Sequence, residues 1–228
     1  MGSLDTLSIG ELRAHAIKTY RVGEGSRPEV SLIQVGDAQA VLKDFGRSAL
    51  WFGRIFGPLL AWREARALRR LVEVYGVPKL IRQVNARALL IEHVEGLSTK
   101  AIPHGSVQPE LFDRLGRLVR EVHQHGVAHC DLRTRGNIIV GRDGQPYLVD
   151  FAAHIGRGRR WNLPWRWAFA QFCKADLVSV VRLKERQAPN LLTAEEQRQL
   201  ELDRTRPVGR IARGIRNLTQ RVLQKERT

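Results

Sequence analysis

The chain has 228 residues, of which 43% are hydrophobic, so it can bury a core as one bilobal domain or as two small domains. Its two cysteines, Cys130 and Cys173, are too few for a disulfide framework and lie in no metal-ligand spacing. No stretch resembles a secretory signal or approaches the ~20 apolar residues of a spanning helix. We therefore expect a cytoplasmic protein that is neither secreted nor transmembrane.

Positive charge is concentrated in the last third of the chain. The formal net charge is +15, and residues 155–228 contain 17 Lys and Arg residues against 7 Asp and Glu residues. Such a field attracts nucleic acid, anionic lipid or acidic substrates, and it does not determine a fold.

The first half of the chain contains strand patterns and one amphipathic helix pattern. Residues 29–35 and 39–43 are β-prone runs on either side of Gly36-Asp37, which predicts a hairpin. Residues 59–74 carry apolar side chains at helical spacing, and residues 88–94 are typical of a buried strand.

The second half is mainly helical by the same criteria. Residues 110–125 predict a helix, and residues 137–140 and 147–149 predict two short strands. An aromatic helical segment at 161–172 and a final basic helix follow. Strands first and helices later favour an α+β protein with two lobes.

One pair of motifs points to phosphoryl transfer. His129-Cys130-Asp131 is followed by Asn137 and then, after the two predicted strands, by Asp150-Phe151-Ala152. Either Asp alone would be a common turn or cap residue. Phosphoryl transfer needs one carboxylate to orient the attacking hydroxyl and other oxygen ligands to hold Mg²⁺, which this joint order supplies.

The pair resembles the catalytic and metal-binding loops of protein kinases, H-x-D…N followed by D-F-G. The resemblance implies that Asp131 is the catalytic base and that His129 is an orienting residue. It also implies that Asn137 and Asp150 hold the metal, and that the cofactors are ATP and Mg²⁺ or Mn²⁺.

The same resemblance assigns residues upstream. Lys43 resembles the strand lysine that pairs with the α- and β-phosphates, and Glu64 its helix partner. Each would otherwise be an ordinary solvated or surface-paired residue. Gly23, Gly25 and Ser26 resemble a shortened glycine-rich loop, although any turn can contain two glycines.

Glu92 and Val94 resemble the hinge between kinase lobes, where backbone groups would bond the adenine edge. The implied fold is a bilobal protein-kinase-like fold. Residues 1–95 would form a small antiparallel β N-lobe with one helix, and residues 96–228 a reduced, mainly helical C-lobe that ends in the basic helix.

Among kinase-like proteins, the sequence most resembles the compact atypical kinases, meaning the RIO family and the bacterial lipopolysaccharide-core sugar kinases. No A-P-E motif follows Asp150. Asn137 lies six positions after Asp131, where the kinase pattern has five, and we expect Gly136 to absorb the extra residue with a positive φ. Asp176 would brace the catalytic loop or, equally, cap the N-terminus of a helix.

The expected function is ATP-dependent transfer of a phosphate to a hydroxyl on a protein Ser/Thr or on a lipopolysaccharide-core sugar. The alternative is a nucleotide-binding ATPase or pseudokinase that acts as a conformational partner, for example in ribosome assembly. A nucleic-acid module is less favoured, because it does not explain the paired Asp motifs.

Aromatic residues interleave with arginine at 51–56 and at 161–169, the second run including Trp161, Trp165 and Trp167. Core packing is the first expectation for these side chains, because Trp buries large areas. One alternative is stacking on nucleic-acid bases, and another is an interface with a membrane. Together with the basic last third, this alternative predicts peripheral attachment to an anionic membrane surface, at the inner face of the membrane.

Overall fold

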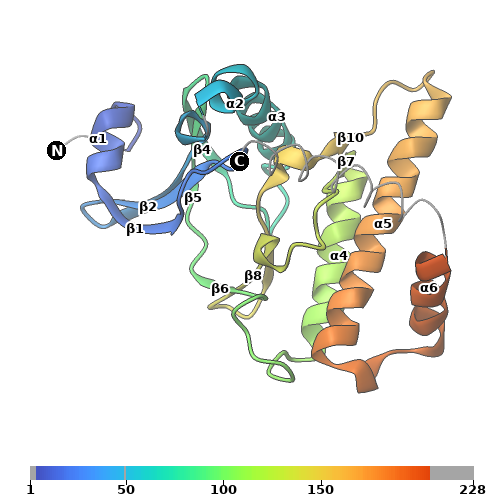
Figure 1. The fold of residues 1–228 in the computed structure, drawn as a ribbon. Coiled ribbons are helices and arrows are strands. Elements are labelled where there is room, and N and C mark those ends of the chain that lie inside the picture. The colour runs from blue at the N-terminus through green and yellow to red at the C-terminus, as the bar shows by residue number, and fades with distance from the viewer. Residues whose placement is uncertain (1–3, 49, 206–228) are drawn as a thin grey trace, which may run out of the picture.

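The computed structural model describes residues 4–48 and 50–205. A five-stranded antiparallel sheet forms the N-terminal part, with strand order β1-β2-β3-β5-β4 (Figure 1). Its strands are β1 (Ala16–Arg21), β2 (Glu29–Val35), β3 (Ala38–Asp44), β4 (Leu80–Asn85) and β5 (Ala88–Glu92). The predicted final basic helix lies outside the described residues.

The two faces of this sheet are covered by different helices. Leu42 of β3 and Leu90 of β5, which lie opposite each other, pack with Leu12 of the short helix α1 (Ile9–Ala14). Leu89 and Ile91 point the other way, into the larger core that contains helix α3 (Gly57–Arg70). Side chains alternate along a strand, so Lys43, next to Leu42, lies on the α3 side.

The hairpin prediction is confirmed. β2 pairs with β3 in a register that ends at Val35 opposite Ala38, and Gly36 takes a left-handed conformation in the connecting turn. Helix α2 (Leu50–Ile55) leads into α3, whose apolar positions Ala61, Ala65 and Leu68 are buried at the expected helical spacing.

The C-terminal part is built on two long helices, α4 (Glu110–Gln124) and α5 (Leu163–Gln187), which lie side by side in Figure 1 and pack together. Helix α6 (Ala194–Thr205) packs against α5. The short strands are β6 (Gly96–Ser98), β7 (Val127–Ala128), β8 (Ile138–Gly141), β9 (Pro146–Leu148) and β10 (Ile155–Gly156). They form the sheets β6-β8-β9 and β10-β7.

The predicted α+β class is confirmed, and one core joins its two parts. Leu68 of α3, Leu89 of β5, Leu115 of α4, Leu148 of β9 and Phe151 belong to the same buried cluster. The loops after β7 and β9 are therefore held against the sheet and α3. The division at residue 95/96 stays a prediction. Within residues 4–48 and 50–205, no helix is long and apolar enough to cross a membrane.

The expectation of core packing is wrong for Trp161, just before α5, and for Trp165 and Trp167 in its first turns. Trp161, Trp165 and Trp167 are 73%, 43% and 66% exposed, whereas Phe169 is buried. This part of α5 extends beyond the end of the neighbouring helix α4 (Figure 1). The side chains of Trp51 and Phe52 lie outside the described residues.

Candidate active site

The site begins with a buried ion pair between the sheet and α3. The Lys43 Nζ lies 2.7 Å from Glu64 Oε2, and both side chains are at most 5% exposed. Burial alone would lower the pKa of Lys43, but the carboxylates of Asp150 and Glu64 outweigh burial and raise it. Burial raises the pKa of Glu64, against the opposing effect of Lys43. The pair fixes α3 against β3.

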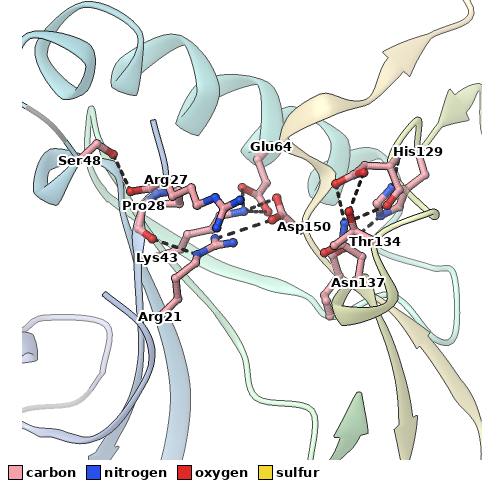
Figure 2. A network of polar contacts seen from close by, with 12 residues as sticks. Arg21, Arg27, Pro28, Lys43, Ser48, Glu64, His129, Thr134, Asn137 and Asp150 are labelled. Carbon is pink, nitrogen blue, oxygen red and sulfur yellow. Dashed lines mark hydrogen bonds and ion pairs between the residues drawn. The ribbon is translucent and has the colours of Figure 1, made fainter. Parts of the chain in front are cut away.

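Asp150 reaches the same lysine from the loop after β9. Lys43 Nζ donates a 2.6 Å hydrogen bond to Asp150 Oδ1, and Arg21 at the end of β1 lies 3.8 Å from Asp150 Oδ2 (Figure 2). Burial opposes ionisation of Asp150, but Lys43 holds its pKa down at about 2. The backbone of Asp150 is left-handed, with φ of 69°. The structure thus places a carboxylate anion beside two cations.

Asp131 lies in the loop after β7, where uncharged side chains donate hydrogen bonds to its carboxylate. Thr134 Oγ1 donates to Asp131 Oδ1 at 2.9 Å, and Asn137 Nδ2 donates to Asp131 Oδ2 at 3.0 Å. Burial raises the pKa of Asp131 despite the Thr134 hydrogen bond, which lowers it. A carboxylate with a raised pKa accepts a proton more readily than an ordinary Asp.

His129 is held inside the protein, between the two loops. It is 1% exposed, its Nδ1 accepts a hydrogen bond from the Asp131 N–H, and its Nε2 lies 3.0 Å from the Val149 carbonyl. A ring that carries its proton on Nε2 satisfies both contacts. The ring also packs on Phe151, with centroids 4.6 Å apart. His129 therefore orients the loops and does not face solvent.

Asp176 of α5 fixes the loop that contains Asp131. Its carboxylate accepts hydrogen bonds from the N–H groups of His129 and Cys130, at 2.7 and 2.9 Å. Asp176 lies well inside α5 and is 2% exposed, so the alternative of a helix cap is wrong. Cys130 has a positive φ of 69°, a conformation that these contacts stabilise.

The expected role of Gly136 is wrong, because Gly136 is not among the residues with a positive φ. A short 3₁₀ turn over Arg135–Asn137 accommodates the extra residue instead. The Asn137 N–H bonds to the Thr134 carbonyl at 2.9 Å, and the Asn137 carbonyl accepts from the Val149 N–H at 3.0 Å. Asn137 is thereby fixed to both loops.

Gly23, Gly25 and Ser26 lie in the turn between β1 and β2, rather than simply ahead of a hairpin as the sequence suggested. A Cβ at Gly23 would lie 2.4 Å from the Arg47 carbonyl oxygen, so only glycine fits there. The Ser48 hydroxyl also donates to the Arg27 carbonyl at 3.1 Å. The turn is packed down close to the end of β3.

Glu92 and Val94 lie where the chain passes from the sheet to the C-terminal part. The Glu92 N–H is already bonded to the Lys79 carbonyl at 2.9 Å. Val94 has no backbone hydrogen bond within the described ranges, which leaves its N–H and carbonyl free to meet a ligand edge.

Two residues of the site were missed by sequence reasoning. Arg21 lies in β1, a strand without clear alternation, and Thr134 lies between the recognised Asp131 and Asn137. A hydroxyl three residues after a motif Asp is a common turn feature and gave no functional signal.

The donor set fits a nucleotide with a divalent cation. Asp150 and Asn137 offer hard oxygen atoms, and Lys43 offers a cation beside them. In the described parts of the chain no group of three or more His, Cys, Asp or Glu side chains could hold a metal ion by itself. Phosphate oxygens and water would complete such a shell, as is usual for Mg²⁺.

Comparison with known proteins agrees with this geometry. No family model matches the sequence. The chain is 28% identical over 160 residues to a 3-deoxy-D-manno-octulosonic acid kinase of Xylella fastidiosa, covering 61% of this chain and 60% of that protein. It is 30% identical over 154 residues to the enzyme of that name in Stenotrophomonas maltophilia, covering 59% and 60%. The chain thus spans about 60% of the length of these curated relatives.

Solved structures of the Rio2 kinase from Chaetomium thermophilum share the fold. One superposes with a TM-score of 0.61 at 18% identity, covering 84% of this chain and 64% of that one. Another, a complex with ADP, Mg²⁺ and phosphoaspartate, gives a TM-score of 0.59 at 17% identity, covering 85% and 67%. The chain therefore has a protein-kinase-like fold that resembles the RIO kinases in structure and the 3-deoxy-D-manno-octulosonic acid kinases in sequence.

Proposed function

We propose that this chain is an ATP-dependent phosphotransferase that moves the γ-phosphate of ATP to a hydroxyl group. The observation that supports it most is the convergence of Glu64 and Asp150 on Lys43, beside a second aspartate, Asp131, that is held by neutral donors. This arrangement provides a cation for phosphate, an oxygen anion for a metal and a separate base.

Each residue has a distinct task in this proposal. Lys43, held by Glu64, binds the α- and β-phosphates, and Asn137 and Asp150 hold Mg²⁺ or Mn²⁺. When bound, Mg²⁺ or Mn²⁺ would supply positive charge to offset the charge that develops on the phosphates. Gly23, Gly25 and Ser26 cover the phosphates with their backbone, and the backbone of Glu92 and Val94 meets the adenine.

Asp131 accepts the proton of the attacking hydroxyl. As the acceptor oxygen forms a bond to the γ-phosphorus, the bond from that phosphorus to the bridging oxygen of ADP breaks, and the hydroxyl proton passes to the Asp131 carboxylate. His129 takes no proton in this scheme, because both of its ring nitrogens are already engaged. Asp176 keeps the loop in place through its two backbone contacts.

The proposed acceptor is a sugar hydroxyl of a lipid-linked glycan, in preference to a protein Ser/Thr. The relatives named for 3-deoxy-D-manno-octulosonic acid kinase support a sugar acid as the acceptor class. The segment after Asp150 lacks an A-P-E motif, which protein kinases use in their peptide-binding lobe.

An acceptor assay tests this choice. Phosphate transfer from labelled ATP with Mg²⁺ would be followed with a lipid A precursor that carries 3-deoxy-D-manno-octulosonic acid, with the same precursor lacking that sugar, and with casein. We expect label only on the sugar-bearing lipid. Label on casein alone would favour a protein kinase, and ATP loss without any labelled acceptor would favour the ATPase alternative.

We also propose that the exposed start of α5 attaches the enzyme to an anionic membrane at its inner, cytoplasmic face. Within residues 160–167, Trp161, Leu163 and Trp167 are each at least 66% exposed. Arg160 directly precedes Trp161, and Arg166 lies between Leu163 and Trp167. Interfacial tryptophans and arginines together suit a headgroup region, where each cation contributes about 1 kcal/mol.

Co-sedimentation tests the attachment. We expect binding to anionic but not zwitterionic vesicles, reduced by high salt and by Trp161→Ala/Trp167→Ala, and unchanged by a Tyr75→Ala control at an exposed aromatic outside this segment. Tight RNA binding at matched salt without vesicle binding would contradict the membrane proposal and favour a nucleic-acid partner.

A further inference from the structure

A cavity lies between the outer face of α3 and the segment that follows Asp150. Its volume is about 470 Å³, and its walls include Trp62, Arg63, Arg66 and Arg70 of α3 together with Arg159 and Trp165. None of the proposed catalytic residues lines it. It is therefore a separate space from the site around Lys43 and Asp150.

The cavity is strongly cationic and its charge is uncompensated. No Asp or Glu lines it. Arg66, Arg70 and Arg159 form no salt bridge with any carboxylate in the described part of the chain. Four guanidinium groups around one space repel each other unless an anion enters.

Arg63 adds a buried donor with nothing to bind. Its Nη2 donates to the His154 carbonyl, which ties α3 to the following segment. Its Nε is buried and has no hydrogen-bond partner. A buried donor without a partner is unfavourable, and such groups call for a ligand or another explanation.

The missing anion does not come from phosphorylation of the adjoining segment. Residues 151–172 contain no Ser, Thr or Tyr. Cys130 also stands where protein kinases commonly have the arginine that binds an activation-loop phosphate. An anion in this cavity would therefore have another origin than phosphorylation of this segment, and a bound small molecule is one such origin.

The aromatic walls indicate what that molecule carries besides charge. The Trp165 ring is fixed by a 2.9 Å hydrogen bond from its Nε1 to the Gly156 carbonyl, and Arg66 stacks over Trp62 at 5.4 Å. Flat indole faces beside guanidinium groups suit a sugar ring that bears a phosphate, because the ring offers an apolar face and the phosphate pairs with Arg.

We propose that this cavity binds the phosphate group of a small phosphate-bearing ligand, with the tryptophan rings against its sugar. Arg63 adjoins Glu64 in α3, so an occupied cavity holds α3 and the segment after Asp150 together. A ligand that binds only the folded protein raises its unfolding temperature. This inference concerns binding alone and does not depend on the proposed phosphotransferase activity.

Calorimetric titration with glucose 1-phosphate, inorganic phosphate and glucose tests the proposal, with a non-hydrolysable ATP analogue and Mg²⁺ present to fill the nucleotide site. We expect glucose 1-phosphate to bind and to raise the unfolding temperature, and glucose not to bind. Inorganic phosphate tests whether the sugar contributes to binding. The tryptophan contacts predict that inorganic phosphate binds more weakly than glucose 1-phosphate.

The exposed pair Arg66→Gln/Arg159→Gln should weaken glucose 1-phosphate about tenfold or more. The control is Arg142→Gln/Arg198→Gln, which removes the same charge at exposed positions outside the cavity. Equal loss in both double variants would show a general charge effect and overturn the proposal. So would affinity for glucose 1-phosphate no higher than for glucose.

Discussion

Two aspartates in neighbouring loops have opposite environments. Asp150 faces Lys43 and Arg21, and its pKa is held down at about 2 despite burial. Asp131 accepts hydrogen bonds from the neutral side chains of Thr134 and Asn137, and burial raises its pKa. Active sites often give two carboxylates different roles by placing them in environments that shift their pKa values in opposite directions. Asp150 is suited to hold a cation, and Asp131 is suited to accept a proton.

The largest expected effect comes from removing the cation that creates the difference. Lys43→Met leaves the buried Glu64 carboxylate and the partly exposed Asp150 carboxylate without their shared partner, which should destabilise the fold by about 3–5 kcal/mol and abolish phosphoryl transfer. Urea unfolding measures the stability. Arg142→Met is the control, because its pair with Glu95 is 76% and 53% exposed and should contribute about 1 kcal/mol or less. A similar loss in the free energy of unfolding in both variants would contradict a larger contribution from the cluster of Lys43, Glu64 and Asp150 than from an exposed ion pair.

Asp150→Asn tests the metal-binding half of the comparison. It replaces an oxygen anion with a neutral amide, so the affinity for Mg²⁺-ATP should fall about tenfold or more, while metal-free nucleotide loses less. Calorimetric titration with and without Mg²⁺ separates these terms. An unaltered dependence on Mg²⁺ would remove Asp150 from the proposed metal shell.

Stability as a function of pH should change in opposite directions for the two Asn variants. Asp150 has a lowered folded-state pKa, so its ionised form adds stability above the unfolded pKa of about 3.9, and that stability is lost as the pH falls toward 2. Asp150→Asn should therefore be less stable than the parent at pH 7, with a smaller difference near pH 3.

Asp131 has a raised folded-state pKa, so its ionisation reduces stability as the pH rises through that value. Asp131→Asn should be more stable than the parent at pH 7, and the gain should vanish below the unfolded pKa. Urea unfolding series at pH 3 to 7 measure both variants. Changes of the same sign at pH 7 would contradict the opposite environments.

The smallest expected effect concerns Thr134. Its hydrogen bond lowers the pKa of Asp131, so Thr134→Ala should move the acidic limb of the pH–rate profile to higher pH, with little change on the high-pH plateau. Thr134→Ser retains the hydroxyl and should restore the limb. A uniform loss of rate at all pH values in Thr134→Ala would instead indicate misplacement of the loop.

The sequence was sufficient where local patterns decide the structure. The hairpin at Gly36, the α3 helix and the α4 helix follow from turn chemistry and apolar spacing, and the structure contains all three. β1 was missed because its residues are nearly all exposed and do not alternate, so only its pairing with β2 defines it.

In the candidate site, too, local motifs were predictable and contacts that depend on tertiary packing were not. The motif order predicted which residues would meet, and Lys43, Glu64 and Asp150 do lie together. Arg21 and Arg63 could not be foreseen, since their contacts depend on how the β1–β2 turn and α3 pack in three dimensions. The exposure of Trp161 and Trp167 was likewise hidden, because apolar composition does not tell which face of a helix remains uncovered.

The most direct test of the account is a comparison of turnover with nucleotide affinity in Asp131→Asn. Because Asp131 contacts Thr134 and Asn137 but not Lys43, the variant should keep its affinity for Mg²⁺-ATP within about threefold. Its single-turnover rate of transfer to the sugar-bearing lipid should fall by about 10²–10⁴, the usual contribution of a general base. Phosphoryl transfer at the parent rate in Asp131→Asn would contradict the assignment of Asp131 as the base.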